Sequence, residues 1–164
     1  MRWNKLTVLI ALLAPVFFPI SSCEPDELTD PPTTYVKRDI IMSGAQQNPA
    51  NASVATGMLN ISYSKVTKTL NYDFTWSQLS SPIQGIGIYG LAPVGYSVFP
   101  PAPVTAPIQT ISITGAGSSG SRSGSLIVDG SRIKEDNLLN GLYYVNIRTN
   151  TYPTGEIRAQ IKFD

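Results

Sequence analysis

Residues 142–161 read LYYVNIRTNTYPTGEIRAQI, and this stretch decides the fold. In its first half Val145 and Ile147 fall on one face of an extended chain, whereas Asn146 and Arg148 fall on the other. The polar residues that follow include a proline and a glycine, which are typical of a turn, and a second extended segment comes after them. The stretch therefore predicts two neighbouring strands, each with one buried face.

The same period of two runs through most of the chain from Tyr35 onward. It is clearest at 59–63 and 70–76, which are separated by a length suited to a hairpin. The predicted strands comprise residues 35–43, 59–63, 70–76, 83–89, 108–114, 124–128, 142–148 and 156–163. Many short strands separated by Gly, Pro, Asn and Ser predict an all-β, antiparallel sandwich or barrel.

Three stretches interrupt this pattern. Residues 131–141 combine a serine cap, early acidic residues, a leucine pair and a terminal glycine, which predicts one short helix at an end of the sandwich. Residues 99–107 are rich in proline and residues 115–124 are rich in glycine and serine, so both are predicted loops.

The N-terminus has the features of an export signal. Arg2 and Lys5 precede an apolar run at 6–20 that two prolines interrupt, and small residues follow, so residues 1–22 are a predicted signal peptide. Ile20-Ser21-Ser22-Cys23 resembles a bacterial lipobox, in which the cysteine becomes acylated, with palmitate among the usual chains. Cys23 is the only cysteine, and lipid attachment explains it; an ordinary signal peptide followed by a chance cysteine is the alternative.

Residues 23–34 form a predicted tether between the lipid and a domain at 35–164. The segment is acidic and rich in proline, a composition too polar to fold on its own. Acidic residues after the lipidated cysteine also resemble signals that send lipoproteins to the outer face of the outer membrane, and a plain soluble spacer is the alternative. The whole chain carries a net charge of +1, which implies no nucleic-acid partner.

Three blocks of the sequence resemble the CHRD domain family over residues 39–162. Residues 142–161 are similar to its Y-V-N-V-H-T and P-x-G-E-I-R-G-Q-L motifs, and residues 41–49 are similar to its opening L-S-G-A-Q-E-V-P-P. Residues 79–90 resemble the block that ends in H-I-H-G. The resemblance implies a Greek-key β-sandwich or barrel, immunoglobulin-like or similar in outline to copper/zinc superoxide dismutase.

The resemblance also implies that this chain departs from the family at its histidines. Gly87, Tyr89 and Arg148 stand where the three histidines would be, and the sequence contains no histidine. The usual ligands of copper and zinc are therefore missing from the domain, and an arginine repels a cation, so we expect no metal and no cofactor.

The sequence offers little for catalysis. A Ser-His-Asp or Cys-His system needs a histidine. Glu156 acting with Asp73 or Asp129 in glycosidic hydrolysis is the remaining alternative. Because Glu156 and Arg158 share a face of a strand, we expect an ion pair at the edge or rim of the sheet.

A candidate ligand site remains at the altered histidine positions. Tyr89, Asn146 and Arg148 are predicted to converge into a polar patch able to bind a carboxylate, a phosphate or a sugar. The alternative is that Tyr89 and Arg148 stack only to fill space. Alternation also predicts a buried Tyr143 and an exposed Tyr144. Most of the remaining aromatic residues that a carbohydrate surface would use are expected in the core: Trp76, Tyr96, Phe99 and Tyr152.

Together these features predict a monomeric, lipid-anchored binding or structural module of the bacterial cell envelope that is not an enzyme. Its expected partners are the membrane, through Cys23, and an extracellular protein or glycan. A metal-independent envelope hydrolase and a purely structural envelope protein are the alternatives.

Overall fold

A computed structural model of the chain describes residues 32–96 and 106–164. Residues Pro32–Asp164 form one compact unit. The predicted signal peptide, Cys23 and most of the predicted tether lie outside the described residues, as does most of the proline-rich loop. Among the residues described, no helix has the length and apolar character needed to cross a membrane.

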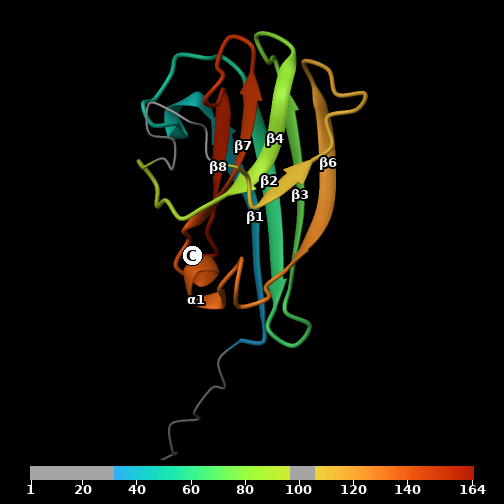
Figure 1. Ribbon diagram of the computed structural model, residues 1–164, viewed down its shortest axis with the longest axis vertical. Helices are drawn as coiled ribbons and strands as arrows, with labels where there is room; N and C mark the ends of the chain where they lie inside the picture. Colours follow the sequence, from blue (N-terminus) through green and yellow to red (C-terminus); the bar gives the residue numbers. More distant parts are fainter. Residues whose placement is uncertain (1–31, 97–105) are drawn as a thin grey trace, which may run out of the picture. The chain divides into compact units, whose positions relative to one another are not determined.

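The domain is a single sheet of eight antiparallel strands that curls into a nearly closed barrel (Figure 1). The strands are β1 (Thr34–Ser43), β2 (Thr56–Ser64), β3 (Thr69–Ser77), β4 (Ile83–Tyr89), β5 (Gln109–Ile111), β6 (Gly120–Ile127), β7 (Tyr143–Thr149) and β8 (Ile157–Ile161). A 3-10 turn, η1 (Gly44–Gln46), follows β1, and a short helix, α1 (Glu135–Leu139), precedes β7. The all-β class predicted from the sequence is confirmed.

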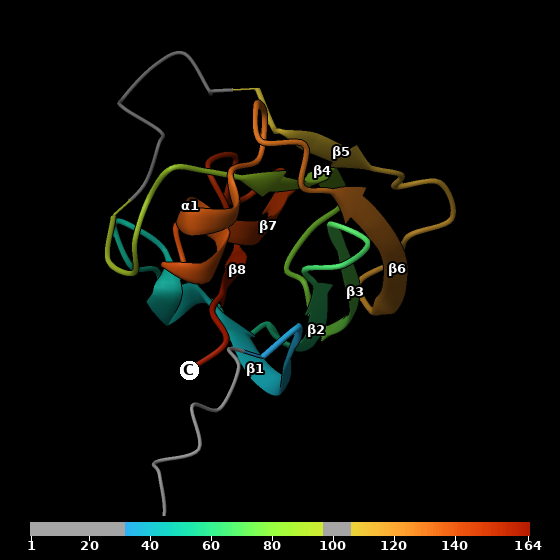
Figure 2. The same cartoon turned by 90° about the horizontal axis from the view of Figure 1, so that it is seen from below.

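The sheet order is β5-β4-β7-β8-β1-β2-β3-β6, which divides naturally into two halves of four strands. The halves join at β1 and β8 through one residue pair, Ser43 and Arg158. At the other side β5 and β6, the two ends of the sheet, lie next to each other (Figure 2). After β3 the chain crosses the barrel to form β4, continues through β5, and returns with β6 to pair beside β3. Strands β3 to β6 therefore follow a Greek-key path.

Arginine side chains close the barrel between β5 and β6. Arg122 on β6 donates from Nε to the Ser112 carbonyl (2.8 Å) and from Nη2 to the Thr114 carbonyl (2.8 Å), just beyond β5. Arg132 donates to the carbonyl of Ile108. These donors cover carbonyl groups that an ordinary ladder of backbone hydrogen bonds would satisfy.

The alternation of apolar and polar residues predicted from the sequence determines which side chains form the core. In β2 and β3 every second side chain is buried, and the two strands pair in a continuous register from Thr56↔Ser77 to Ser64↔Thr69. Apart from Met58, their outward residues are polar and form a solvated face, as is common for an antiparallel sheet. The predicted hairpin between them is confirmed.

Strands β7 and β8 are buried on both faces, which the alternation does not reveal. Residues 44–55 and 90–96 send polar contacts onto the outer face of these strands. The expectation of an exposed Tyr144 is therefore wrong, because its side chain is fully buried, while the buried position of Tyr143 is confirmed.

Several element boundaries differ from the predictions; β5, for example, covers only 109–111 of the predicted 108–114. Strand β6 begins at Gly120, so residues 120–123 extend a strand although their composition predicts a loop. The glycines leave room for rings of β3, since a Cβ on Gly120 would lie 2.6 Å from Trp76 and one on Gly124 would lie 2.5 Å from the Tyr72 hydroxyl. Helix α1 covers only five of the residues in the stretch 131–141.

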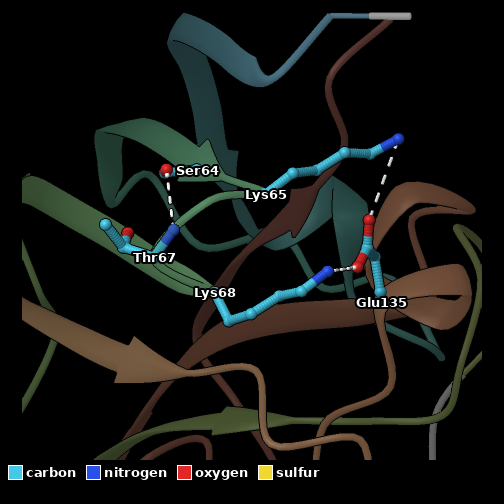
Figure 3. A network of polar contacts seen from close by, with 5 residues as sticks. All are labelled: Ser64, Lys65, Thr67, Lys68 and Glu135. Atoms are coloured by element: carbon cyan, nitrogen blue, oxygen red, sulfur yellow. Dashed lines mark hydrogen bonds and ion pairs between the residues drawn. The ribbon is translucent and has the colours of Figure 1, made fainter.

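Polar contacts tie α1 to the β2–β3 hairpin (Figure 3). Lys68 donates to one Glu135 carboxylate oxygen at 2.5 Å, and Lys65 lies 3.8 Å from the other. Ser64 Oγ accepts the Thr67 backbone N–H at 3.2 Å and shapes the turn that carries both lysines. The Lys68 contact is the largest cause that lowers the pKa of Glu135.

Candidate functional site

Two of the three predicted patch residues meet on the outer face of β4 and β7. Gly85 and Arg148 are register partners, and a Cβ on Gly85 would lie 2.6 Å from Arg148 Nη2, so the guanidinium passes directly over the glycine. The Arg148 guanidinium also reaches the Tyr89 hydroxyl. Burial raises the pKa of Tyr89, and the charge and hydrogen bonding of Arg148 lower it by a smaller amount. The net pKa of Tyr89 is raised.

Arg148 is the accessible member of this patch. Its residue is half-buried, whereas Tyr89 and Asn146 are buried. Its Nε atom is buried and has no hydrogen-bond partner among the residues that the structure describes. This buried N–H donor is left unsatisfied by the surrounding described groups.

Asn146 serves the protein's own loops. Its Oδ1 accepts from Gln47 Nε2 at 2.8 Å, and its Nδ2 donates to the Thr154 carbonyl at 2.9 Å. These bonds join the segment after η1 to the β7–β8 turn. Gly155 packs so tightly against Asn146 and Gln47 that a side chain there would collide with both amides.

Tyr89 stacks on Tyr144, its register partner on β7. The ring centroids are 5.7 Å apart and the planes differ by 21°. The guanidinium of Arg158 lies on Tyr144, 3.7 Å from the ring centroid. Arg148, Tyr89, Tyr144 and Arg158 thus form a continuous row of cations and aromatic rings across β4, β7 and β8.

Arg158 and Gln160 hold the segment 90–96 by its backbone. Arg158 donates to the carbonyls of Ala92 and Pro93 at 3.2 Å each, and to that of Tyr96. Its Nη2 also donates to Gln160 Oε1 at 2.6 Å. Arg158 is 1% exposed, and burial lowers its pKa.

Glu156 is buried inside a cradle of its own. Oε1 accepts from Ser53 Oγ (2.7 Å) and the Ser80 backbone N–H (2.9 Å), and Oε2 accepts from Thr149 Oγ1 (2.6 Å). Burial raises the pKa of Glu156, but these hydrogen bonds together outweigh it and the net pKa is lowered. Neutral donors thus keep the carboxylate ionised.

The expected ion pair between Glu156 and Arg158 is wrong. Both residues are buried, and each is solvated by neutral polar groups of the protein instead of by the other. The reason is local: β8 begins at Ile157, so Glu156 lies in the preceding turn, where its side chain turns toward Ser53 and Ser80.

The other carboxylates considered for hydrolysis have separate roles. Asp73 on β3 accepts from Asn60 Nδ2 at 2.9 Å. Asp129 accepts the backbone N–H groups of residues 131–133, which lower its pKa. Within residues 32–96 and 106–164, no three His, Cys, Asp or Glu side chains gather into a group able to hold a metal ion.

The segment that follows the first sequence block meets the middle and last blocks around Glu156. Asn51 Nδ2 donates to the carbonyls of Gly155 and Glu156 at 3.1 Å each, and Ser53 Oγ donates to the Glu156 carboxylate, so the segment directly after the first block docks onto the last block. The middle block adds Ser80.

The CHRD domain model matches residues 39–161. The chain belongs to the CHRD domain family. No curated protein and no solved structure matches it. Within this CHRD domain, polar groups of the last block form hydrogen bonds that connect the loops at residues 44–55 and 90–96 to the barrel.

Sequence reasoning missed the structural roles of Glu156, Arg158 and Gln160. Because Arg158 and Gln160 alternate with Ile157, Ala159 and Ile161, hydropathy reads them as a solvated face. The one available signal is that the CHRD motif itself contains the same Glu, Arg and Gln.

Proposed function

We propose that this CHRD protein is a non-catalytic binding module of the bacterial cell envelope, anchored by lipid on Cys23. At the family level the match indicates a binding or structural module. The proposal that the protein is not catalytic rests on Glu156, both of whose carboxylate oxygens accept hydrogen bonds from the protein itself. A carboxylate held in this way stabilises the fold and has no oxygen directed at a substrate.

The N-terminal sequence supports the anchor. Ile20-Ser21-Ser22-Cys23 follows an apolar run, and the acidic residues after it separate the cysteine from β1, which begins at Thr34. Eleven residues of extended chain reach at most about 40 Å. That length is enough to hold the barrel clear of a membrane surface.

Arg148 supports ligand binding at the patch. A half-buried guanidinium suits a carboxylate, a phosphate or a sugar hydroxyl as its partner. The Tyr89 ring, which is stacked on that of Tyr144, packs next to the Arg148 guanidinium and helps to hold it in place. We propose an extracellular protein or glycan as the partner, with the protein as a monomer at the outer membrane.

The first experiment tests location. Intact cells are treated with protease, beside cells that produce the Cys23→Ala variant. Digestion of the wild-type domain without lysis, together with release of the variant from the membrane fraction, is the expected result. Protection until lysis would contradict a surface location, and membrane retention of Cys23→Ala would contradict the anchor.

A second experiment tests the absence of catalysis. The full-length protein is incubated with isolated envelope polysaccharide and released reducing ends are measured. We expect no release above a heat-treated control. Turnover by the wild type that Glu156→Gln abolishes would overturn the proposal in favour of a hydrolase.

A further inference from the structure

The outer face of β1, β2, β3 and β6 contains a polar hollow of about 470 Å³. Its polar lining comes from all four strands and includes Arg38, Asn60, Asn71, Asp73 and Ser123, and Val36 adds an exposed apolar side chain. The hollow lies on the solvated face, in the half of the barrel opposite the candidate patch. Its volume falls within the range typical of small-ligand sites.

Strand register arranges these side chains in two rows. Ser62 pairs with Asn71, which pairs with Ser125, and one step along the strands Asn60 pairs with Asp73, which pairs with Ser123. Side chains two residues apart on one strand lie about 6.6 Å apart, and neighbouring strands are about 4.8 Å apart. The result is a grid of amide, hydroxyl and carboxylate groups on one surface.

A β-bulge positions the charged end of this grid. The register of β1 against β2 shifts between Lys37 and Ile40, and Asp39 has a φ of 57°. Asn60 Oδ1 accepts the Asp39 N–H at 2.9 Å, while Asn60 Nδ2 donates to Asp73 Oδ1 at 2.9 Å. One amide thus holds the bulge and orients the carboxylate, and bulges commonly redirect side chains at functional sites.

The guanidinium of Arg38 is available to a ligand. The residue is exposed, and its side chain has no hydrogen bond or ion pair within the described parts of the chain. Asp73 keeps a second carboxylate oxygen beyond the one bonded to Asn60. The hollow therefore offers a strong hydrogen-bond donor, Arg38, and a strong acceptor, Asp73, together with amide and hydroxyl groups.

We infer that this hollow binds a neutral saccharide, an inference that rests on the proposed binding function. Asp73 disfavours an anionic ligand, Arg38 disfavours a cation, and the polar lining disfavours an apolar molecule. A compact neutral ligand rich in hydroxyl groups matches both the donors and the acceptors. The exposed side chain of Val36, which lines the hollow, offers apolar contact for carbon–hydrogen faces of the sugar.

The test uses full-length protein in a detergent without a sugar headgroup, applied to an array of short neutral oligosaccharides of glucose, galactose, mannose and N-acetylglucosamine. The dissociation constant for retained sugars is then measured by calorimetry. Asp73→Asn is expected to weaken binding about tenfold to a hundredfold, because it removes a charge-assisted hydrogen bond. The melting temperature should change little.

Two controls locate the site. Asp164→Asn removes the same charge at an exposed position near the C-terminus and should bind as the wild type does. Arg148→Ala distinguishes the two candidate sites, because sugar binding that this variant loses belongs to the patch on β4 and β7 and not to the hollow. Ser123→Tyr fills the hollow from the exposed side of β6 without touching the core and should abolish binding.

The inference is overturned if no oligosaccharide is retained, or if Asp73→Asn and Ser123→Tyr both bind normally. It is also overturned if these variants alter self-association of the chain instead of sugar binding. Loss of sugar binding in Arg148→Ala alone would overturn the hollow as the site, yet leave the proposed binding function standing. Failure of the anchor proposal shows instead in the Cys23→Ala fractionation.

Discussion

Arg158 lies with its guanidinium 3.7 Å from the centroid of the Tyr144 ring, and both residues are buried on the outer face of the barrel. The same guanidinium donates to three backbone carbonyls of residues 92–96. A single side chain therefore joins β8, β7 and the segment after β4. Because its acceptors are neutral, its charge is stabilised by dipoles and a ring quadrupole.

Arg158→Met should destabilise the domain by about 3 kcal/mol, since it leaves buried carbonyls without donors. Chemical denaturation followed by tryptophan fluorescence measures the change. Arg38→Met is the matched control, because Arg38 is exposed, and it should shift stability by less than about 0.5 kcal/mol. Equal losses in the two variants would show that Arg158 is not a structural tie.

Glu156 should make the domain sensitive to acid. Its folded pKa is lowered from 4.5, so its contribution to stability is present above pH 4.5 and is lost as pH falls through the folded value. Glu156→Gln should lose about 2 kcal/mol at neutral pH, because an amide cannot accept from all three donors.

The measurement is the melting temperature of both proteins from neutral pH down to pH 3. The wild type should lose stability over the acid range, and the Glu156→Gln curve should be flatter there. Asp129 and Glu135 also have lowered pKa values, so some acid sensitivity remains in the variant. Parallel curves would contradict the role assigned to Glu156.

The fold was predictable where one face of a strand meets solvent. In β2 and β3 the outward residues other than Met58 are polar and the inward ones are apolar, so hydropathy alone identifies both strands and their hairpin. At β7 and β8 the same alternation misleads. Tyr144, Arg158 and Gln160 occupy outward positions, but residues 44–55 and 90–96 cover them.

The candidate site was predictable only in part, for a related reason. Strand register brings Arg148 to Gly85 and Tyr89 to Tyr144, and the position of Tyr89 and Arg148 follows from the CHRD motifs. The hydrogen bonds that occupy Asn146 come from Gln47 and Thr154, in loops whose paths no periodicity specifies. Loop-to-sheet contacts of this kind depend on tertiary packing and not on local pattern.

The link between α1 and the hairpin should be weak. Glu135 contacts Lys68 and Lys65 at partly exposed positions, so the ion pairs are screened by solvent and salt. Glu135→Gln should destabilise the domain by less than about 1 kcal/mol at low salt, and by less still at high salt. Denaturation at two salt concentrations checks this. A large loss that salt does not reduce would indicate a buried role for Glu135.

Arg122 should control closure of the barrel. It bonds the carbonyls of Ser112 and Thr114, and its guanidinium lies 5.6 Å from the centroid of the Trp76 ring. Arg122→Ala should therefore expose the edges of β5 and β6, which are free of ladder partners toward each other in the described sheet.

We expect faster amide hydrogen exchange over residues 109–127 in Arg122→Ala, a loss of about 1 to 2 kcal/mol, and concentration-dependent association through the opened strands. Hydrogen exchange and light scattering measure these effects. Lys134→Ala, which removes a positive charge from an exposed side chain before α1, is the control and should leave exchange at β5 and β6 unchanged. If Arg122→Ala exchanges as the wild type does, the arginine contacts are not what closes the barrel, and the packing of β5 against the core must hold the two edges together.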